Sequence, residues 1–148
     1  MNTGIEIVLN TIHVGSARRV VTLGLDGKDL AQEFLTSLAK SNRPGFDMIQ
    51  ARVKAIAEHE HHENQYTFRH LVGGLYEFKR PGLRLYAFYD ELPGLKPQLI
   101  IATSGGTKNS PKEQSRDIAK AQSIQQRYLA AKSKSDTTIK LLTLTDET

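Results

Sequence analysis

One carboxylate and two cations are predicted to share one face of a β-hairpin. Residues 75–80 and 83–90 are short runs of apolar, aromatic and charged residues, and a Pro-Gly pair joins them. Proline at the second position and glycine at the third suit a tight turn. Side chains alternate between the two faces of a strand, so the resulting register places Glu77, Lys79 and Arg84 together. Fixed cations of this kind are suited to bind a phosphate.

The sequence leaves two roles open for Glu77. Its carboxylate can orient the neighbouring cations or act as a base, or it can form a salt bridge to Arg84 that only holds the sheet. The opposite face of the hairpin is mainly apolar and is expected to pack on helices. Arg80 is expected to point to that opposite face.

The positive charge of the chain is concentrated around the hairpin. The 148 residues carry a formal net charge of +4, and residues 61–135 contain twice as many basic as acidic side chains. Concentrated positive charge attracts polyanions and releases their counterions. A basic, merely soluble surface remains the alternative.

Composition excludes several other classes of protein. The chain has no cysteine, which excludes disulfides and thiolate chemistry. No apolar run approaches the roughly 20 residues that a membrane-spanning helix needs, so no membrane partner is expected. Residues 1–10 lack a basic leader followed by an apolar stretch, and the cytoplasm is therefore the expected location.

The pattern of apolar residues, caps and breakers predicts an α+β domain over residues 1–148. A capping box at Asp29 and Gln32 opens a first helix, the breaker at 41–45 ends it, and Asp47 is expected to cap a second. Ser110, with proline next and Glu113 at the third position, opens a helix that runs to about residue 132. Strands are expected at 5–9, 19–25, 75–80, 83–90, 98–103 and 139–144, with a glycine-containing loop at 104–109.

A run of histidines at 59, 61 and 62 has two interpretations. His59 and His62 can share a helix face, which raises the possibility of metal binding, although the spacing differs from that of His-Glu-x-x-His sites. A solvated helix end is the favoured interpretation, because histidine near a helix C-terminus suits the helix dipole. No metal site is therefore expected.

Three motifs in this order resemble the RelE/HigB toxin superfamily, in particular its phage-derived branch. The family's second strand resembles Leu75-Tyr76-Glu77-Phe78-Lys79, and its next strand resembles the run from Arg84 to Asp90. Its last helix resembles Asp117-Ile118-Ala119-Lys120-Ala121 followed by Tyr128. The resemblance covers roughly residues 19–130, and leaves residues 1–18 as an N-terminal extension and 133–148 as a tail.

The resemblance implies a fold, an activity and partners. The fold is a small antiparallel-rich sheet packed against two N-terminal helices, with a C-terminal helix. The activity is that of the toxin of a type II toxin–antitoxin system, a ribosome-associated endoribonuclease that cleaves messenger RNA through attack by the ribose 2′-hydroxyl. Neither metal nor cofactor is implied. The expected partners are messenger RNA on the ribosome, a cognate antitoxin and a second copy of the chain as a homodimer.

Residue by residue, the resemblance makes Arg84 the phosphate clamp and Lys79 the second cation, with Glu77 beside them. Where family members have two lysines before the last helix, this chain has Gly105-Gly106, or Lys108 and Asn109 if a short insertion is allowed. Lys108 is therefore the fourth catalytic candidate. Candidate RNA-binding residues are Arg69, His70, Arg80, Lys112, Arg116 and Tyr128. Tyr128 has an alternative role as a core tyrosine.

The loss of at least one of these lysines keeps a second function open. The chain can be a catalytically weakened RelE-like module of phage origin that binds RNA or protein. A third possibility is a phage structural or accessory protein with no nucleic-acid role.

Overall fold

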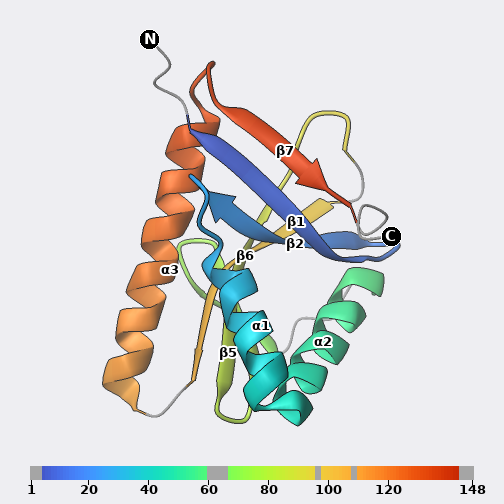
Figure 1. The fold of residues 1–148 in the computed structure, drawn as a ribbon, viewed down its shortest axis with the longest axis vertical. Coiled ribbons are helices and arrows are strands. Elements are labelled where there is room, and N and C mark those ends of the chain that lie inside the picture. The colour runs from blue at the N-terminus through green and yellow to red at the C-terminus, as the bar shows by residue number, and fades with distance from the viewer. Residues whose placement is uncertain (1–4, 60–66, 96–97, 108–109, 144–148) are drawn as a thin grey trace.

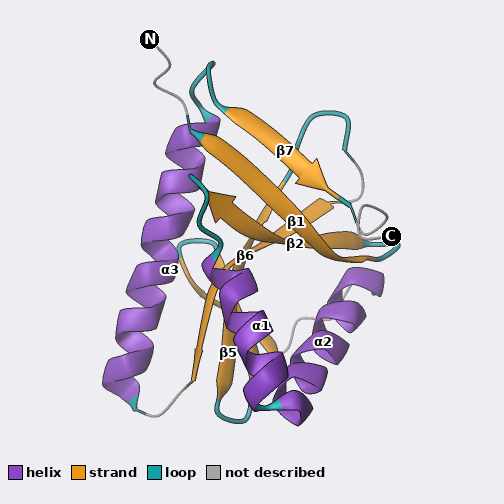
Figure 2. Cartoon of the chain, in the orientation of Figure 1, coloured by secondary structure: helices purple, strands orange, loops and turns teal. Residues whose placement is uncertain are grey.

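The computed structural model describes residues 5–59, 67–95, 98–107 and 110–143 (Figure 1). Within these ranges the elements follow in the order β1 (Glu6–Val14), β2 (Arg18–Leu25), α1 (Leu30–Ser41), α2 (Arg43–Glu58), β3 (Phe68–Val72), β4 (Leu75–Arg80), β5 (Leu83–Asp90), β6 (Gln98–Thr107), α3 (Pro111–Lys132) and β7 (Thr138–Leu142). The seven described strands form one mixed sheet with three helices (Figure 2), which confirms the predicted α+β class.

The sheet has the order β3-β4-β5-β6-β2-β1-β7. β2 runs parallel to β6, and β1 runs parallel to β7, while the other neighbours are antiparallel. The parallel β2–β6 pair joins the N-terminal hairpin to the β3–β6 meander. The two helices between these units, α1 and α2, provide the long crossover that such a connection needs.

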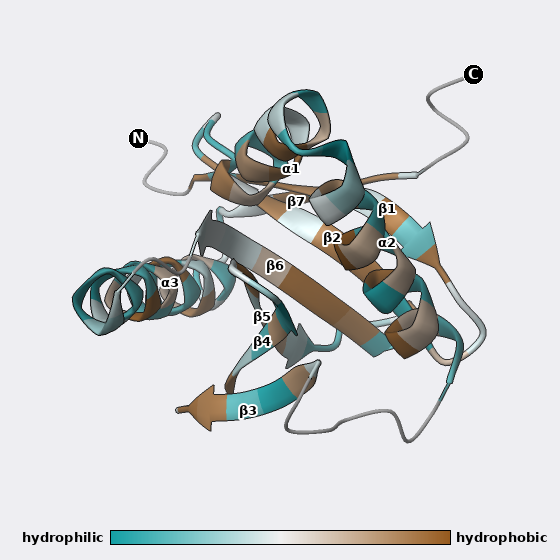
Figure 3. Cartoon of the chain, turned by 90° about the horizontal axis from the view of Figure 1, so that it is seen from below, coloured by the Kyte–Doolittle hydropathy of each residue, from teal (hydrophilic) through white to brown (hydrophobic). Residues whose placement is uncertain are grey.

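The helices cover both faces of the sheet. α1 and α2 pack on one face over a core that includes Val20, Ile49, Phe78 and Leu85. α3 packs on the other face over a core that includes Leu23, Phe88, Ile101 and Tyr128. Figure 3 shows α3 on the opposite side of the sheet from α1 and α2. Of the helices in the described ranges, none has the length and apolar character needed to cross a membrane.

The start of the second helix differs from the prediction. Asn42 is the N-cap of α2 and accepts a hydrogen bond from the Gly45 N–H, whereas Asp47 lies within the first turns and pairs with Arg43. The predicted breaker is therefore reduced to one residue between α1 and α2. Proline is tolerated here because the first-turn N–H groups of a helix have no intrahelical partner.

The β1–β2 turn completes the C-terminal end of α2. Arg18 donates hydrogen bonds to the carbonyl oxygens of Ile56 (2.9 Å) and His59 (2.6 Å), and the Ala17 N–H donates to that of Ala57 (3.0 Å). The last carbonyls of a helix lack intrahelical donors. These contacts satisfy them and fasten the hairpin to α2.

The predicted loop after residue 103 is part of strand β6, which continues to Thr107. Gly105 and Gly106 point to opposite faces of the sheet. A Cβ built on Gly105 would lie 2.2 Å from the Phe34 ring of α1, and one built on Gly106 would lie 2.3 Å from a carboxylate oxygen of Asp117 in α3. The two glycines let both helices approach the same strand closely, so lysines at these positions would displace the packing.

Gly105→Ala is expected to lower the free energy of unfolding by about 1–3 kcal/mol, because the Phe34 ring must move out of the space that the new methyl group needs. Urea denaturation measures the change. Gly24→Ala is the matched strand control, since its nearest contact would be 3.3 Å, to the Val8 carbonyl oxygen. Equal stability of the two variants would show that the close approach is not needed.

Candidate functional site

The predicted hairpin register is confirmed. Glu77 lies opposite Tyr86, and Lys79 lies opposite Arg84. Glu77, Lys79 and Arg84 therefore share the face of the sheet that α3 partly covers. Gly106 of β6 lies opposite Arg84 and continues this row beneath α3.

The edge strand β3, which the sequence analysis did not predict, adds a second arginine. Arg69 lies opposite Glu77 in the β3–β4 pair. Its Nε lies 2.6 Å from Oε2 of Glu77, and Nε of Arg84 lies 3.1 Å from Oε1 of the same carboxylate. Gln114 of α3 places its side-chain nitrogen 3.5 Å from Oε1. Each oxygen of Glu77 therefore has a guanidinium beside it.

The three charged side chains differ in their access to solvent. The Glu77 side chain is fully buried, the Arg84 side chain is 4% exposed and the Arg69 side chain is 37% exposed. Nη1 of Arg84 also donates to the carbonyl oxygens of Arg80 (2.9 Å) and Leu83 (2.8 Å) at the two ends of the β4–β5 turn. The salt bridge considered for Glu77 and Arg84 is thus present, and it ties the turn to the carboxylate.

Tyr86 places a hydroxyl on the same sheet face, beneath α3. The residue is 1% exposed and packs with Leu75 and Ala121 beneath α3. Within the described ranges its buried hydroxyl has no hydrogen-bond partner. Burial raises the pKa of Tyr86 to about 12, and the negative charges of Asp117 and Glu77 act in the same direction. At neutral pH Tyr86 is therefore a phenol that can donate a proton, not a base.

Asp117 approaches this region from α3. Burial raises the pKa of its carboxyl group, and Lys120 opposes that shift. Asp117 lies over Gly106, so its carboxylate is close to Tyr86 and Arg84 on the sheet face that α3 covers. This carboxylate reduces the attraction of the covered region for an anion.

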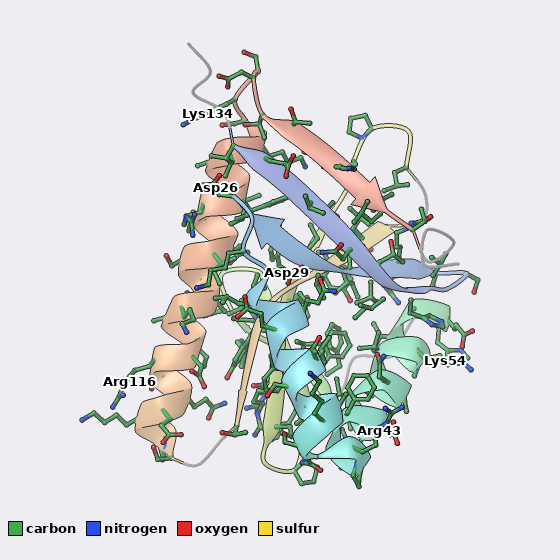
Figure 4. All side chains as sticks on the ribbon, in the orientation of Figure 1. Asp26, Asp29, Arg43, Lys54, Arg116 and Lys134 are labelled. Atoms are coloured by element: carbon green, nitrogen blue, oxygen red, sulfur yellow. The ribbon has the colours of Figure 1, made fainter. Side chains whose placement is uncertain are left out.

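The other predicted site residues are distributed around the cluster. Lys79 is half-buried and His70 is exposed. Lys112 and Arg116 are exposed on the first turns of α3, and Figure 4 shows Arg116 there. Arg80 contacts the sulfur of Met48 in α2 at 3.7 Å and therefore lies on the opposite face, as predicted. Lys108 lies outside the described residues.

Two further expectations concern Tyr128 and the histidines. Tyr128 is fully buried and donates a 2.5 Å hydrogen bond to Asp90, to which Lys132 also donates, so the core role applies. Burial raises the pKa of Tyr128, and the hydrogen bond to Asp90 adds to the shift. In the described ranges no group of three potential ligands is placed to hold a metal, while His61 and His62 lie outside those ranges.

The sequence contained a signal for the missed strand. Residues 68–72 read Phe-Arg-His-Leu-Val and precede a Gly-Gly pair with positive φ at both glycines. A Gly-Gly pair between two short runs that contain aromatic and β-branched or aliphatic residues is typical of a hairpin. No comparable pattern indicated Gln114, because its side chain reaches Glu77 only through the tertiary placement of α3.

Comparisons with protein-family models, curated proteins and solved structures found no match to this chain.

Glu77→Ala is expected to lower the free energy of unfolding by about 3–5 kcal/mol, because it leaves the buried guanidinium of Arg84 without its carboxylate. Urea denaturation measures the loss. The control is Asp47→Ala, which breaks an exposed ion pair with Arg43 and should cost less than about 1 kcal/mol. Similar losses in the two variants would contradict a stabilising role for the buried cluster.

Stability should fall in alkali partly because of Tyr86. Its pKa is raised from an ordinary value of 10 to about 12. The contribution of the neutral phenol to the free energy of unfolding is therefore complete below pH 10 and is lost as the pH rises to about 12. Urea midpoints between pH 8 and 11 should fall less steeply for Tyr86→Phe than for the wild-type chain. Near pH 8 the two proteins should differ little, since the hydroxyl has no partner to lose in the described ranges. Parallel pH profiles would contradict the assignment.

Proposed function

We propose that this protein is a RelE/HigB-like toxin that acts as a ribosome-associated endoribonuclease on messenger RNA, with an antitoxin as its natural inhibitor. The observation that carries the proposal is the gathering of Arg69, Lys79 and Arg84 on one sheet face around the carboxylate of Glu77. Apart from the unpredicted strand β3 between α2 and β4, the succession β2-α1-α2-β4-β5-β6-α3 also follows the order of elements on which the sequence resemblance rests.

The cations suit the electrostatic part of RNA cleavage. Attack of a ribose 2′-oxygen on the adjacent phosphorus forms a new O–P bond and breaks the bond to the 5′-oxygen. The 2′-hydroxyl loses a proton, and the departing 5′-oxygen gains one. Negative charge increases on the phosphoryl oxygens in between, and cations held at that point lower the barrier. Three cations against the two carboxylates of Glu77 and the nearby Asp117 leave a surplus of positive charge.

The arrangement also defines a second candidate, a RelE-like module that binds RNA or protein without efficient cleavage. Two observations favour it. Both oxygens of Glu77 are paired, and Arg84 is buried, so neither presents a free group to a substrate. The close packing of Gly105 and Gly106 leaves no room for the two lysines that the resemblance implies at that point.

Cleavage separates the two candidates. Induced expression of the wild-type chain should arrest growth, and purified ribosomes carrying a message should yield new 5′ ends. Lys79→Gln should reduce cleavage by about 10²–10³-fold, because it removes a cation that faces the phosphate. Lys54→Gln removes the same charge from the outer side of α2 (Figure 4) and should leave cleavage unchanged.

Harmless induction together with no new 5′ ends would eliminate the nuclease function. Binding of RNA that weakens steeply with salt would then support the non-cleaving module.

A further inference from the structure

The two arginines that pair with Glu77 face different surroundings. Arg84 is enclosed, with its Nε at the carboxylate and its Nη1 on two backbone carbonyls. Arg69 lies on the edge strand and keeps 37% of its side chain exposed. A phosphate approaching this face can therefore reach Arg69 without any movement of α3, whereas Arg84 is covered.

Arg69 contacts Glu77 through one of its three guanidinium nitrogens. Its Nε is held 2.6 Å from Oε2 of Glu77. A guanidinium carries five N–H donors, and those on the two terminal nitrogens remain when Nε is engaged. In the ranges that the structure describes, the terminal nitrogens of Arg69 make no hydrogen bond.

Arg84 fixes the carboxylate from its other side. Its contacts with the carbonyls of Arg80 and Leu83 anchor it at the β4–β5 turn, and its Nε forms an ion pair with Oε1 of Glu77 at 3.1 Å. The contacts thus form a continuous series from the turn, through Arg84 and Glu77, to the half-exposed Arg69. A side chain held in this way loses less conformational freedom when it binds a ligand.

We infer that Arg69 is the residue that binds the RNA phosphate, and that Glu77 and Arg84 are positioning residues that hold its guanidinium in place. This inference rests on the proposed RNA-binding function and assigns the roles within it. The sequence resemblance made Arg84 the phosphate clamp and Arg69 one of several further RNA-binding candidates. The burial of Arg84 and the exposure of Arg69 instead give the phosphate to Arg69. Planar bidentate recognition of a phosphate is the particular capacity of arginine.

Binding of a labelled single-stranded RNA oligomer, titrated at several salt concentrations, tests Arg69 directly. Arg69→Gln should lower the affinity about tenfold or more and make the slope of log affinity against log salt shallower by about 0.7, the value for one phosphate contact on a single strand. Glu77 keeps Arg84 as a partner in this variant. The control Arg127→Gln removes an equal charge from an exposed position on α3, four turns from its start, and should leave the slope unchanged.

Arg69→Lys separates positioning from charge. Lysine keeps the positive charge but cannot hold Glu77 with one nitrogen while presenting two others. The inference predicts an affinity well below that of the wild-type chain, whereas a requirement for charge alone predicts wild-type affinity. Because Arg69 is half-exposed, thermal unfolding should show both Arg69 variants folded at the assay temperature.

Glu77→Gln gives a test of sign. Loss of a negative charge beside a phosphate should strengthen binding if only charge matters, and should weaken it if Glu77 orients Arg69. The comparison is made at a temperature where circular dichroism shows the variant folded; if it does not fold, Arg69→Lys decides the question.

RNA affinity that is unchanged in Arg69→Gln, or equal to wild type in Arg69→Lys, would overturn the role inferred for Arg69. The proposed RNA-binding function of the protein would still stand. Absence of any salt-dependent RNA binding by the wild-type chain would overturn the proposed function and the inference together.

Discussion

The buried carboxylate of Glu77 is the constraint on which this face of the sheet depends. A carboxylate removed from water costs several kcal/mol unless opposite charges and hydrogen bonds compensate for it. Here the compensation comes from three different elements: Arg69 from β3, Arg84 from β5 and Gln114 from α3. The requirement fixes the pairing of β3 with β4, because a shift of one residue would turn Arg69 to the opposite face.

The same constraint determines where the molecule can meet a polyanion. α3 covers the centre of the charged face, and its close approach depends on the absence of a side chain at Gly106. Arg69 on the edge strand remains accessible, with 37% of its side chain exposed, and Lys79 is half-buried. Arg84 is buried, and it contacts the Glu77 carboxylate and two backbone carbonyls of the β4–β5 turn. The two arginines of one cluster therefore differ in role: Arg69 is exposed and can contact a ligand, and Arg84 is buried and supports the carboxylate that holds Arg69.

The sequence predicted the local features of this arrangement better than its tertiary features. Caps at Asp29 and Ser110 and the Pro-Gly turn are signals confined to a few residues, and the structure confirms them. Strand alternation correctly placed Glu77 opposite Tyr86. The prediction for Asp47 was wrong because Asn42, close before the proline, offers an equally good cap.

Other features depend on contacts between distant residues and could not be read from the chain. Glycines at 105 and 106 suggest a loop when considered alone, yet they belong to a strand because they pair with Leu85 and Arg84 of β5. Two helices occupy the space beside them. Burial of Arg84 follows from the position of α3, and no pattern around residue 84 contains that position. A charged residue in a predicted strand therefore does not show that its side chain is exposed, because a helix packed on that face of the sheet can bury it.

The parallel pairing of β1 with β7 has a consequence for the synthesis of the chain. Glu6 pairs with Thr138, so β1 finds one of its two neighbours only after all the elements between β1 and β7 have been made. Contacts of such long sequence separation form late, since a large loop must close before they contribute. Until then the outer edge of β1 offers unpaired backbone groups to any strand nearby, which gives the nascent protein an interval in which another chain can occupy the place of β7.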